Sequence, residues 1–430
     1  MITTKYVRDN IDDIRASIAK RQSNFPIDEL LKDDEEWRAI KTELQRLQAE
    51  RNKESMKVSE LKKKGKDAAK KIAQLAELKG RVEDGEKRLK EKEARIDELI
   101  WSLPNILDKS VPVGMPPDGN KTLRTWGKPK QDGKSHEELL INAGLLDMER
   151  AAKIAGSRFY ILRGDLVLLE QSLLRYALDF LTAKGYTPIL PPFMLRKSYY
   201  RGVAPIATFE DALYYVGESR EAAERRGIEH LEDELYMIAT AEHAMAAMHA
   251  GELFSGKDLP LKYAGISPCF RREAGAHGAD TKGIFRVHQF DKVEQFIYCR
   301  EEDEQKYFDE LLSNSEQIVQ ALEIPYRLQL LCSGDTGHQM SKTVDIEGHF
   351  PAQKDYREIG SCSSAAAWQS IRLDIRYDHM GERKYVYTLN NTGLSAERML
   401  VCIVENYANE DGTITVPKAL RPYMHKDVIG

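Results

Sequence analysis

Hydrophobic residues in the first hundred positions recur every seven residues, in two registers. In the first stretch the repeat comprises Trp37, Leu44 and Val58 with Arg51 as a polar member, and Ile40, Leu47 and Leu61 with Glu54 as an interruption. A second stretch repeats the pattern at Leu75, Val82, Leu89 and Ile96. A heptad repeat with a narrow apolar seam is typical of helices that pair as a coiled coil. We therefore predict two long helices in this part of the chain.

The two helical stretches are separated by the lysine-rich run 63–66, which contains Gly65. Because glycine allows the chain to reverse, the simplest arrangement is an antiparallel hairpin of helices of about 30 residues, each ~45 Å long. Beyond Trp101, prolines in the segments 102–107 and 111–117 break the helix. This predicts an N-terminal coiled-coil arm over residues 1–110 and a second domain over residues 111–430.

The second domain mixes helical and strand patterns. Helical periodicity covers 164–183, 241–250 and 301–322. Runs rich in Val, Ile and Tyr, which are typical of strands, cover 286–290, 293–298, 326–332, 370–377 and 384–389. These runs lack regularly spaced intervening helices, which argues against a doubly wound parallel sheet. The fold class we predict is α+β, with the coiled-coil hairpin followed by a mainly antiparallel sheet flanked by helices.

Composition and charge exclude some classes of protein and restrict how the chain could bind nucleic acid. The chain has 430 residues, 42% of them hydrophobic and 31% charged, which excludes a collagen-like or wholly disordered protein. With a net charge of -5, the chain could bind nucleic acid only through a local basic patch. Six lysines lie between Lys62 and Lys71, at or beside the predicted turn. These lysines form either the solvated surface of a coiled coil or a basic surface that binds phosphate groups electrostatically.

The sequence contains no apolar run that could serve as a signal peptide or membrane span, so we expect a cytoplasmic protein with no membrane partner. Its five cysteines include no Cys-x-x-Cys pair, so neither a disulfide framework nor a local zinc site is indicated.

Familiar nucleotide-binding loops are absent from the sequence. The nearest candidate, 127–135, has too long a gap between its glycines, contains a proline and follows no apolar strand. No dinucleotide-binding glycine fingerprint follows a strand either. If the chain uses ATP, charge and stacking over a sheet must hold the nucleotide.

Three separated segments combine unusual residues. The first, Lys-Gly-Tyr-Thr-Pro-Ile-Leu-Pro-Pro at 184–192, ends a helix and begins an apolar strand. The second reads Phe-Arg-Arg-Glu at 270–273 and resumes, after a glycine-rich loop, as Arg-Val-His-Gln-Phe-Asp-Lys-Val-Glu at 286–294. The third reads Thr-Leu-Asn-Asn-Thr-Gly at 388–393, followed by Leu-Ser-Ala-Glu-Arg.

In order and spacing, these segments resemble the signature motifs of the class II aminoacyl-tRNA synthetases, most closely those of the seryl-tRNA synthetase family. Motifs 1, 2 and 3 would cover about 175–195, 268–294 and 388–405. The resemblance extends over nearly the whole chain, including the arm and the Thr-Ala-Glu triplet at 240–242. It implies an enzyme that activates L-serine with ATP to seryl-adenylate and transfers serine to the 3′ end of serine tRNA, with selenocysteine tRNA as a further acceptor.

Activation brings two anions together, because the serine carboxylate attacks the α-phosphorus of ATP. By resemblance, Arg271, Arg286 and Arg398 are the catalytic residues. Arg271 would hold the α-phosphate and the serine carboxylate, while the other two would hold the outer phosphates; guanidinium groups suit this because they donate paired hydrogen bonds. The residues implied to bind ATP are Arg271, Arg272, Glu273, Arg286, Val287, Phe290, Glu358, Ile359, Gly360, Ser361 and Arg398. Phe290 would stack on adenine, and Glu273, placed on one strand with Arg271, would face the same side.

The resemblance also implies a Mg²⁺ site at Glu358 and Ser361. A carboxylate and a hydroxyl are hard oxygen ligands, which favour magnesium over zinc. In the same segment Gly360 stands where the family commonly has serine, and Ser364 with Ala365 stands where an Asn-Cys pair is common. We therefore expect a local shape that departs from the family pattern.

The serine-binding residues implied by the resemblance are Thr240, Ala241, Glu242, Arg271, Glu294, Asn390 and Thr392. Thr240 and Glu242 would bind the α-amino group, and the last three would surround the side-chain hydroxyl. Such a site can reject alanine by ~10⁴-fold or more, because alanine leaves buried polar groups unpaired. The plainer alternatives are that Glu294 is a strand residue exposed to water and that Thr392 bonds local backbone in a turn.

The arm would recognise the long variable arm of serine tRNA by shape, through Lys62, Lys63, Lys64 and Lys66. Because motif 1 forms the subunit interface in the family, a homodimer is expected. Two alternatives remain: a tRNA-independent relative that makes an aminoacyl-adenylate, which the arm argues against, and a non-catalytic paralogue, which the intact motif residues argue against. For the segment 218–234, rich in Glu and Arg, we expect only a solvated helix.

Overall fold

The computed structural model describes residues 4–205, 209–217, 225, 234–273 and 282–430. The described residues up to 104, other than 20–22, form one compact unit, and residues 20–22 with those from 105 onward form another. Within the described ranges, no helix combines the length and apolar character that crossing a membrane would require. The segment 218–234 falls outside the described residues except at positions 225 and 234.

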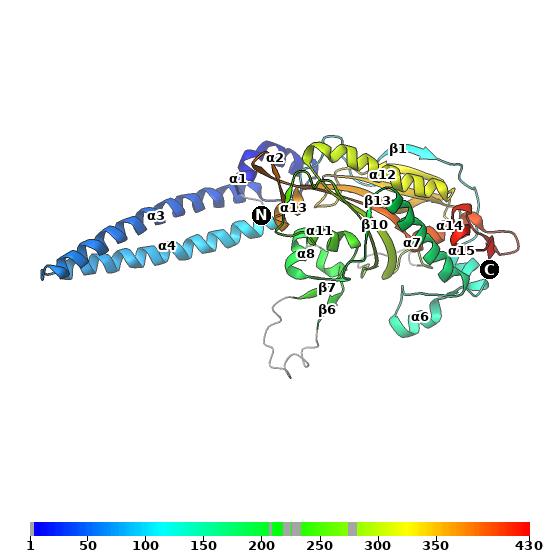
Figure 1. The fold of residues 1–430 in the computed structure, drawn as a ribbon, viewed down its shortest axis with the longest axis horizontal. Coiled ribbons are helices and arrows are strands. Elements are labelled where there is room, and N and C mark those ends of the chain that lie inside the picture. The colour runs from blue at the N-terminus through cyan, green and yellow to red at the C-terminus, as the bar shows by residue number, and fades with distance from the viewer. Residues whose placement is uncertain (1–3, 206–208, 218–224, 226–233, 274–281) are drawn as a thin grey trace. The chain divides into compact units, whose positions relative to one another are not determined.

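The smaller unit contains the predicted helical hairpin. Helices α3 (Ile27–Lys63) and α4 (Ala69–Ser102) pack along each other (Figure 1) and are longer than the sequence pattern indicated, at 37 and 34 residues. Their apolar seam centres on Leu44, Leu47, Leu78 and Val82. Two short helices without a heptad signature, α1 (Thr4–Asp9) and α2 (Ile11–Lys20), precede the hairpin.

The turn of the hairpin lies where the sequence places it. Gly65 has φ +63°, a left-handed conformation that glycine adopts without strain. The four lysines expected to contact tRNA, Lys62, Lys63, Lys64 and Lys66, are all exposed at or next to this turn. Glu54, which interrupts the heptad, is bonded by Lys57 at 2.6 Å and by Lys71 at 2.9 Å, so its carboxylate is neutralised at the helix surface.

The larger unit is built on an eight-stranded sheet. Its strands, in spatial order, are β1 (Lys121–Trp126), β11 (Tyr326–Leu330), β12 (Lys342–Phe350), β13 (Asp355–Ala366), β16 (Tyr387–Ser395), β10 (Gln289–Cys299), β9 (Leu261–Phe270) and β4 (Thr187–Ile189). Every neighbouring pair is antiparallel except β4 with β9. The predicted α+β class and mainly antiparallel sheet are confirmed.

Shorter elements surround this sheet. The small strands are β2 (Leu146–Asp147), β3 (Ile161–Leu162), β5 (Met194–Arg196), β6 (Tyr215–Val216), β7 (Leu235–Met237), β8 (Leu253–Ser255), β14 (Arg376–His379), β15 (Glu382–Tyr385), β17 (Ile414–Thr415) and β18 (Val428–Ile429). The helices are α5 (His136–Asn142), α6 (Met148–Ala155), α7 (Asp165–Ala183), α8 (Lys197–Val203), α11 (Ala241–Ala247), α12 (Glu304–Ala321), α13 (Trp368–Leu373), α14 (Ala396–Tyr407) and α15 (Arg421–Met424).

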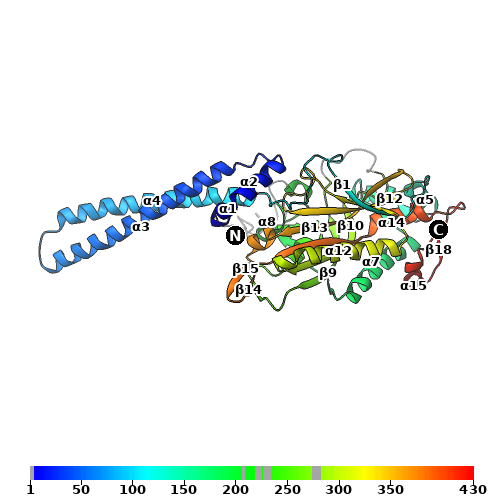
Figure 2. The ribbon, with the colours of Figure 1, turned by 90° about the horizontal axis from the view of Figure 1, so that it is seen from above.

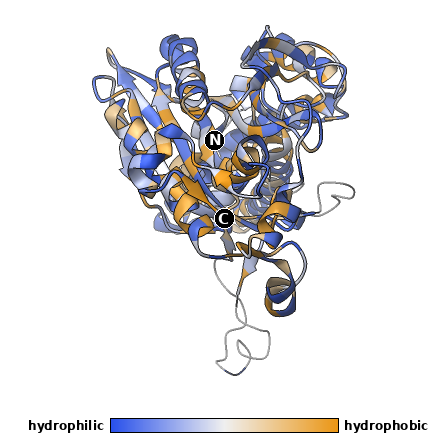
Figure 3. Cartoon of the chain, turned by 90° about the vertical axis from the view of Figure 1, so that its right-hand side faces the viewer, coloured by the Kyte–Doolittle hydropathy of each residue, from blue (hydrophilic) through white to orange (hydrophobic). Residues whose placement is uncertain are grey.

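Strand β10 divides the core in two, because successive side chains point to opposite faces. Val293 and Ile297 join the core formed with α7, α12 and α14, whereas Phe296 and Tyr298 join a second core that contains residues of α8, α11 and α13. Figure 2 shows α7 and α12 lying across one face of the sheet, and Figure 3 shows apolar residues interspersed with polar ones through the strands. The end of β10 that carries Phe290 to Glu294 is therefore available for a polar site on the face away from α7 and α12.

Three of the strand predictions are wrong in part, one of them because the run 384–389 covers the end of β15 and the start of β16. Within 370–377, residues up to Leu373 belong to helix α13, and the strand begins only at Arg376. A short buried apolar run does not distinguish helix from strand by periodicity, and here Asp374, with φ +56°, separates the two elements. The run 286–290 is also not a separate strand: β10 starts at Gln289 and continues through 293–298.

Candidate functional site

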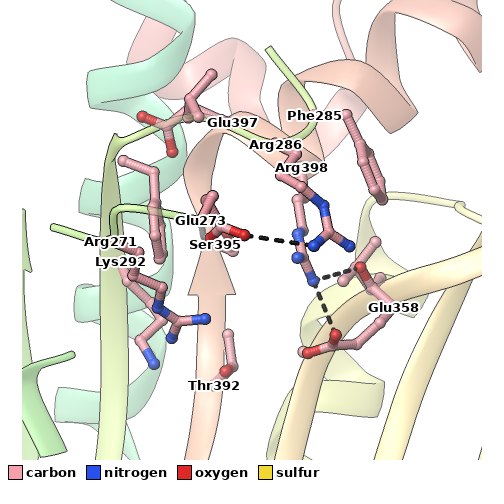
Figure 4. A pocket seen from close by; sticks show the side chains of 14 residues that line it. Arg271, Glu273, Phe285, Arg286, Lys292, Glu358, Thr392, Ser395, Glu397 and Arg398 are labelled. Carbon is pink, nitrogen blue, oxygen red and sulfur yellow. Dashed lines mark hydrogen bonds and ion pairs between the residues drawn. The ribbon is translucent and has the colours of Figure 1, made fainter. Parts of the chain in front are cut away.

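A pocket opens beside the central strands of the sheet, where segments distant in sequence meet (Figure 4). Its wall is formed by Arg271, Glu273, Phe285, Arg286, Val287, Phe290, Lys292, Glu358, Ile359, Gly360, Thr392, Ser395, Glu397 and Arg398. The pocket thus combines four basic side chains with three carboxyl groups. Ten of the residues expected to bind ATP or serine are among them.

The three arginines of the sequence motifs converge on this pocket. Arg271 follows β9, Arg286 precedes β10, and Arg398 lies in the first turn of α14. Arg286 Nη1 lies 3.3 Å from Glu273 Oε2. Arg398 Nη1 donates to the Glu358 carbonyl at 2.8 Å and lies 3.1 Å from its carboxylate, as Figure 4 shows.

Arg271 is oriented by its own backbone and by the adjacent strand. Its amide donates to the His288 carbonyl at 2.9 Å, one step beyond the last β9–β10 pair, and His288 Nδ1 donates back to the Arg271 carbonyl at 2.8 Å. Its guanidinium donates from Nε to the Ala239 carbonyl at 3.2 Å and stacks 5.1 Å from the centre of the Phe290 ring. These contacts hold one cationic group against one aromatic ring at the pocket wall.

Glu273 does not share a strand with Arg271, contrary to the expectation from sequence. Strand β9 ends at Phe270, and Glu273 has φ +47°, which turns the chain out of the extended conformation. Its carboxylate enters the pocket by this turn and reaches Arg286. Arg272 is exposed and does not line the pocket; its amide donates to the Ala212 carbonyl at 2.9 Å.

Glu358 is held ionised by the cations around it. The Glu358 side chain is 45% exposed, but the pocket wall desolvates it, which by itself favours the protonated form. The charges of Arg398, Arg271 and Lys292 outweigh this effect and lower the pKa of Glu358. The pocket therefore keeps one carboxylate ionised beside the converging arginines.

Ser361 lies deeper on the same strand and does not line the pocket. It pairs across the sheet with Asp345 and forms a side-chain hydrogen bond to it. Burial, and then the charge of Glu358, raise the pKa of Asp345 well above its ordinary value. Two carboxyl groups and a hydroxyl are an oxygen donor set that suits a hard cation. The described residues hold no cluster of three or more His, Cys, Asp or Glu arranged as a metal site.

The residues expected to bind serine meet at the inner side of the pocket. Thr240 caps helix α11 by accepting from the Glu242 amide at 3.3 Å, and its hydroxyl donates to Glu294 Oε2 at 2.7 Å. Glu294 pairs across the sheet with Thr392, which lines the pocket. Glu294 is 1% exposed, so it is not the solvated strand residue of the plainer alternative, and Thr392 lies within β16 and not in a turn.

Two buried polar groups in this region, the Glu242 carboxyl and the Asn390 amide, can each bind a polar group of a ligand. Burial, and then the charge of Glu294, raise the pKa of Glu242 to about 7, and Gln369 donates to this carboxyl at 2.9 Å. Asn390 Nδ2 is buried and has no hydrogen-bond partner among the described residues. Because buried donors are almost always paired in folded proteins, this amide is ready to bind a polar ligand. Ala241, the remaining member of the expected set, is fully buried.

Packing and hydrogen bonds surround both positions where the sequence departs from the family pattern, Gly360 and Ser364. A Cβ atom on Gly360 would stand 3.1 Å from the Thr392 Cβ, so a serine there would press on Thr392. Gly360 thus leaves room for the present position of that side chain. Ser364 is buried, accepts from the Ala366 amide at 2.9 Å and bonds to Glu304.

Four residues of the pocket wall were not predicted from the sequence. Phe285 stacks 5.1 Å from the Arg398 guanidinium, and Glu397 accepts from the Asp291 amide at 3.0 Å. Lys292 and Ser395 complete the set. Lys292 was detectable, because it lies two residues from both Phe290 and Glu294 and must share their face of the strand.

Comparisons with known proteins agree with this arrangement. Residues 1–107 match the model of the seryl-tRNA synthetase N-terminal domain, and residues 224–407 match that of the class II tRNA synthetase core domain (G, H, P, S and T). The serine–tRNA ligase of Methanocella arvoryzae is 40% identical over 99% of both chains, and that of Cenarchaeum symbiosum is 43% identical over 100% of both. The crystal structure of seryl-tRNA synthetase from Pyrococcus horikoshii complexed with ATP has a TM-score of 0.91 at 40% identity, covering 100% of this chain and 99% of that one.

Proposed function

The chain belongs to the seryl-tRNA synthetase family, and we propose that its reaction takes place where Arg271, Arg286 and Arg398 meet. The enzyme uses ATP to activate L-serine and attaches the serine to tRNA. The observation that carries the proposed site is the convergence of three guanidinium groups, from separate motifs, on one pocket. Neither the tRNA-independent relative nor the non-catalytic paralogue is favoured by any comparison.

In this pocket Arg271 holds the serine carboxylate and the α-phosphate, which screens two anions that would otherwise repel. Arg286 and Arg398 hold the outer phosphates and the leaving pyrophosphate. Phe290 stacks on adenine. The remaining ATP contacts fall to Arg272, Glu273, Val287, Glu358, Ile359, Gly360 and Ser361.

Serine lies with its ammonium group between Thr240 and Glu242, beside Ala241. Glu294, Asn390 and Thr392 surround its hydroxyl, and the unpaired Asn390 amide supplies a donor for it. Alanine would leave these buried groups unsatisfied, which is costly.

Glu358 and Ser361 would hold Mg²⁺. Their oxygen atoms, beside the Asp345 carboxyl, fit this hard cation, which would supply additional positive charge for the phosphates. Pyrophosphate exchange should stop when a chelator removes the ion and resume when Mg²⁺ is returned. Exchange that survived thorough chelation would remove Mg²⁺ from the proposal.

Residues 1–110 form the tRNA-binding arm and residues 111–430 the catalytic domain. The arm recognises the long variable arm of serine tRNA through the lysines of its turn, and the enzyme acts in the cytoplasm as a homodimer. Imaging of a tagged chain tests the compartment; a signal confined to an organelle would refute it.

The sharpest test of the site is Arg271→Ala. Removal of one charge-stabilising donor should lower serine-dependent pyrophosphate exchange by about 10²–10³-fold. The melting temperature should stay near that of the wild type, since among the described residues the Arg271 side chain is held by one hydrogen bond, to the Ala239 carbonyl, and by its stacking on Phe290 at the pocket wall. Retained exchange would place the chemistry elsewhere. Arg383→Ala serves as the matched control, because Arg383 is exposed and lies outside the pocket wall, and it should keep wild-type exchange.

A further inference from the structure

Lys292 is a buried cation in the wall of this pocket. It lies on β10, paired across the sheet with Ser267 of β9 and Ser395 of β16. Only 8% of its side chain is exposed. Lysine is almost never buried unless a carboxylate neutralises it, so the identity of its partner indicates what it does.

The partner of Lys292 is Glu294. The ammonium group pairs with Glu294 Oε2, and both side chains leave the same face of the strand because the residues are two apart. The hydroxyl of Thr240 donates to that same oxygen at 2.7 Å. Among the described residues no donor reaches Oε1 of Glu294, so this second oxygen is available to a substrate.

The surroundings of Lys292 are rich in ionisable groups from several elements. Those that its charge influences or that pair with it are Glu242 and His243 on α11, Cys269 on β9, Glu294 on β10 and Glu358 on β13; Arg271, after β9, acts on four of them as well. The charge of Glu294 raises the pKa of Glu242, and that of Lys292 opposes this rise. Without Lys292, the pKa of Glu242 would therefore rise further.

We infer that Lys292 is a positioning residue for serine selection: its ammonium group pairs with Glu294 Oε2 and fixes that carboxylate so that its second oxygen accepts a hydrogen bond from the serine hydroxyl. This inference rests on the proposed placement of serine beside Glu294. An ionised carboxylate can only accept hydrogen bonds, and its bond to a hydroxyl is stronger than that of a neutral acid. Lys292 therefore acts on substrate choice through Glu294 and does not itself touch the reacting atoms.

The test compares Lys292→Met, which is unbranched, one atom shorter and uncharged, with Lys292→Arg, which keeps the charge. Serine-dependent pyrophosphate exchange is measured from about pH 6 to pH 9, with alanine as the competing amino acid. For Lys292→Met the KM for serine should rise about tenfold or more, well beyond any change in the KM for ATP. The midpoint of its kcat/KM profile should move to higher pH, because the charge of Lys292 no longer lowers the pKa of Glu242. Lys292→Arg should restore both properties in large part.

A double variant guards against a simple failure to fold. Lys292→Met with Glu294→Gln removes both buried charges, so it should be at least as stable as Lys292→Met alone. Its serine-to-alanine preference should match that of Glu294→Gln alone, because Lys292 would then have no carboxylate to act on.

The outcomes separate this inference from the proposed function. A wild-type enzyme that shows serine-dependent exchange, together with a Lys292→Met variant whose KM for serine and pH midpoint are unchanged, would overturn the role of Lys292 alone. That role is also overturned if Lys292→Met raises the KM values for serine and ATP equally, with no shift in pH. Exchange that is insensitive to Glu294→Gln would instead overturn the placement of serine.

Discussion

At the scale of single residues, recognition depends on buried charges that restrain one another. Glu242 and Glu294 approach closely enough that burial and mutual repulsion raise the pKa of Glu242 to about 7. The Asn390 amide is unpaired in the same region of the described structure. By the proposed placement, a small substrate that brings an ammonium group and a hydroxyl would satisfy the carboxylates and the amide at once. Serine would then relieve the repulsion between the two carboxyl groups of the free enzyme.

Binding of serine should therefore depend on pH. The ammonium group prefers ionised Glu242, and this carboxyl takes up a proton as pH falls through about 7. The kcat/KM for serine should consequently fall below pH 7, by up to about tenfold per pH unit. Glu242→Gln should lower kcat/KM by about 10–100-fold and flatten this limb. A wild-type profile that stays level down to pH 5.5 would contradict the role of Glu242.

At the scale of elements, the sequence predicts those with long periodic patterns and leaves others undetermined. The heptads of α3 and α4 and the antiparallel character of the sheet are confirmed because many residues repeat one signal. The sequence did not predict helix α13, because its buried apolar run is too short to show a helical period. It also could not show that Gln369 on this helix donates a hydrogen bond to Glu242, because that contact depends on tertiary structure. Motif residues were identified by resemblance, but that Glu273 reaches Arg286 through a left-handed turn depends on tertiary structure.

The turn of the arm yields a separate prediction. Replacing Lys62, Lys63, Lys64 and Lys66 by alanine removes exposed cations without touching the α3–α4 seam. The affinity for serine tRNA should fall about tenfold or more and become less dependent on salt, because fewer phosphate contacts remain. Serine-dependent pyrophosphate exchange, which needs no tRNA, should be unchanged.

The matched control replaces four exposed lysines on the helices of the arm, Lys32, Lys79, Lys87 and Lys90. An equal loss of tRNA affinity in both variants would show that the turn has no special role. Deleting residues 27–99 should likewise spare exchange and collapse charging.

At the scale of the whole molecule, the described residues form two compact units. The larger carries the pocket, and the smaller carries the basic turn. The larger unit also presents apolar side chains in and beside motif 1, with Leu168 51%, Leu190 73% and Met194 42% exposed. Burial of these exposed apolar groups against a second copy would stabilise the proposed homodimer.

The dimer is tested by its mass in solution. We expect twice the chain mass of 49.0 kDa, and Leu190→Asp should shift the equilibrium toward the monomer by placing a charge in the interface. A wild-type mass equal to one chain at micromolar concentration would refute the dimer.

The central claim is that the pocket beside Glu294 recognises a small hydroxylated amino acid through groups that only a hydroxyl can satisfy. It is tested most directly by ATP–pyrophosphate exchange of the wild-type enzyme with serine, alanine, glycine and threonine in parallel. We predict exchange with serine, a kcat/KM for alanine lower by ~10⁴-fold, and rejection of threonine by its extra methyl group. Comparable exchange with serine and alanine, or none with serine, would contradict the account.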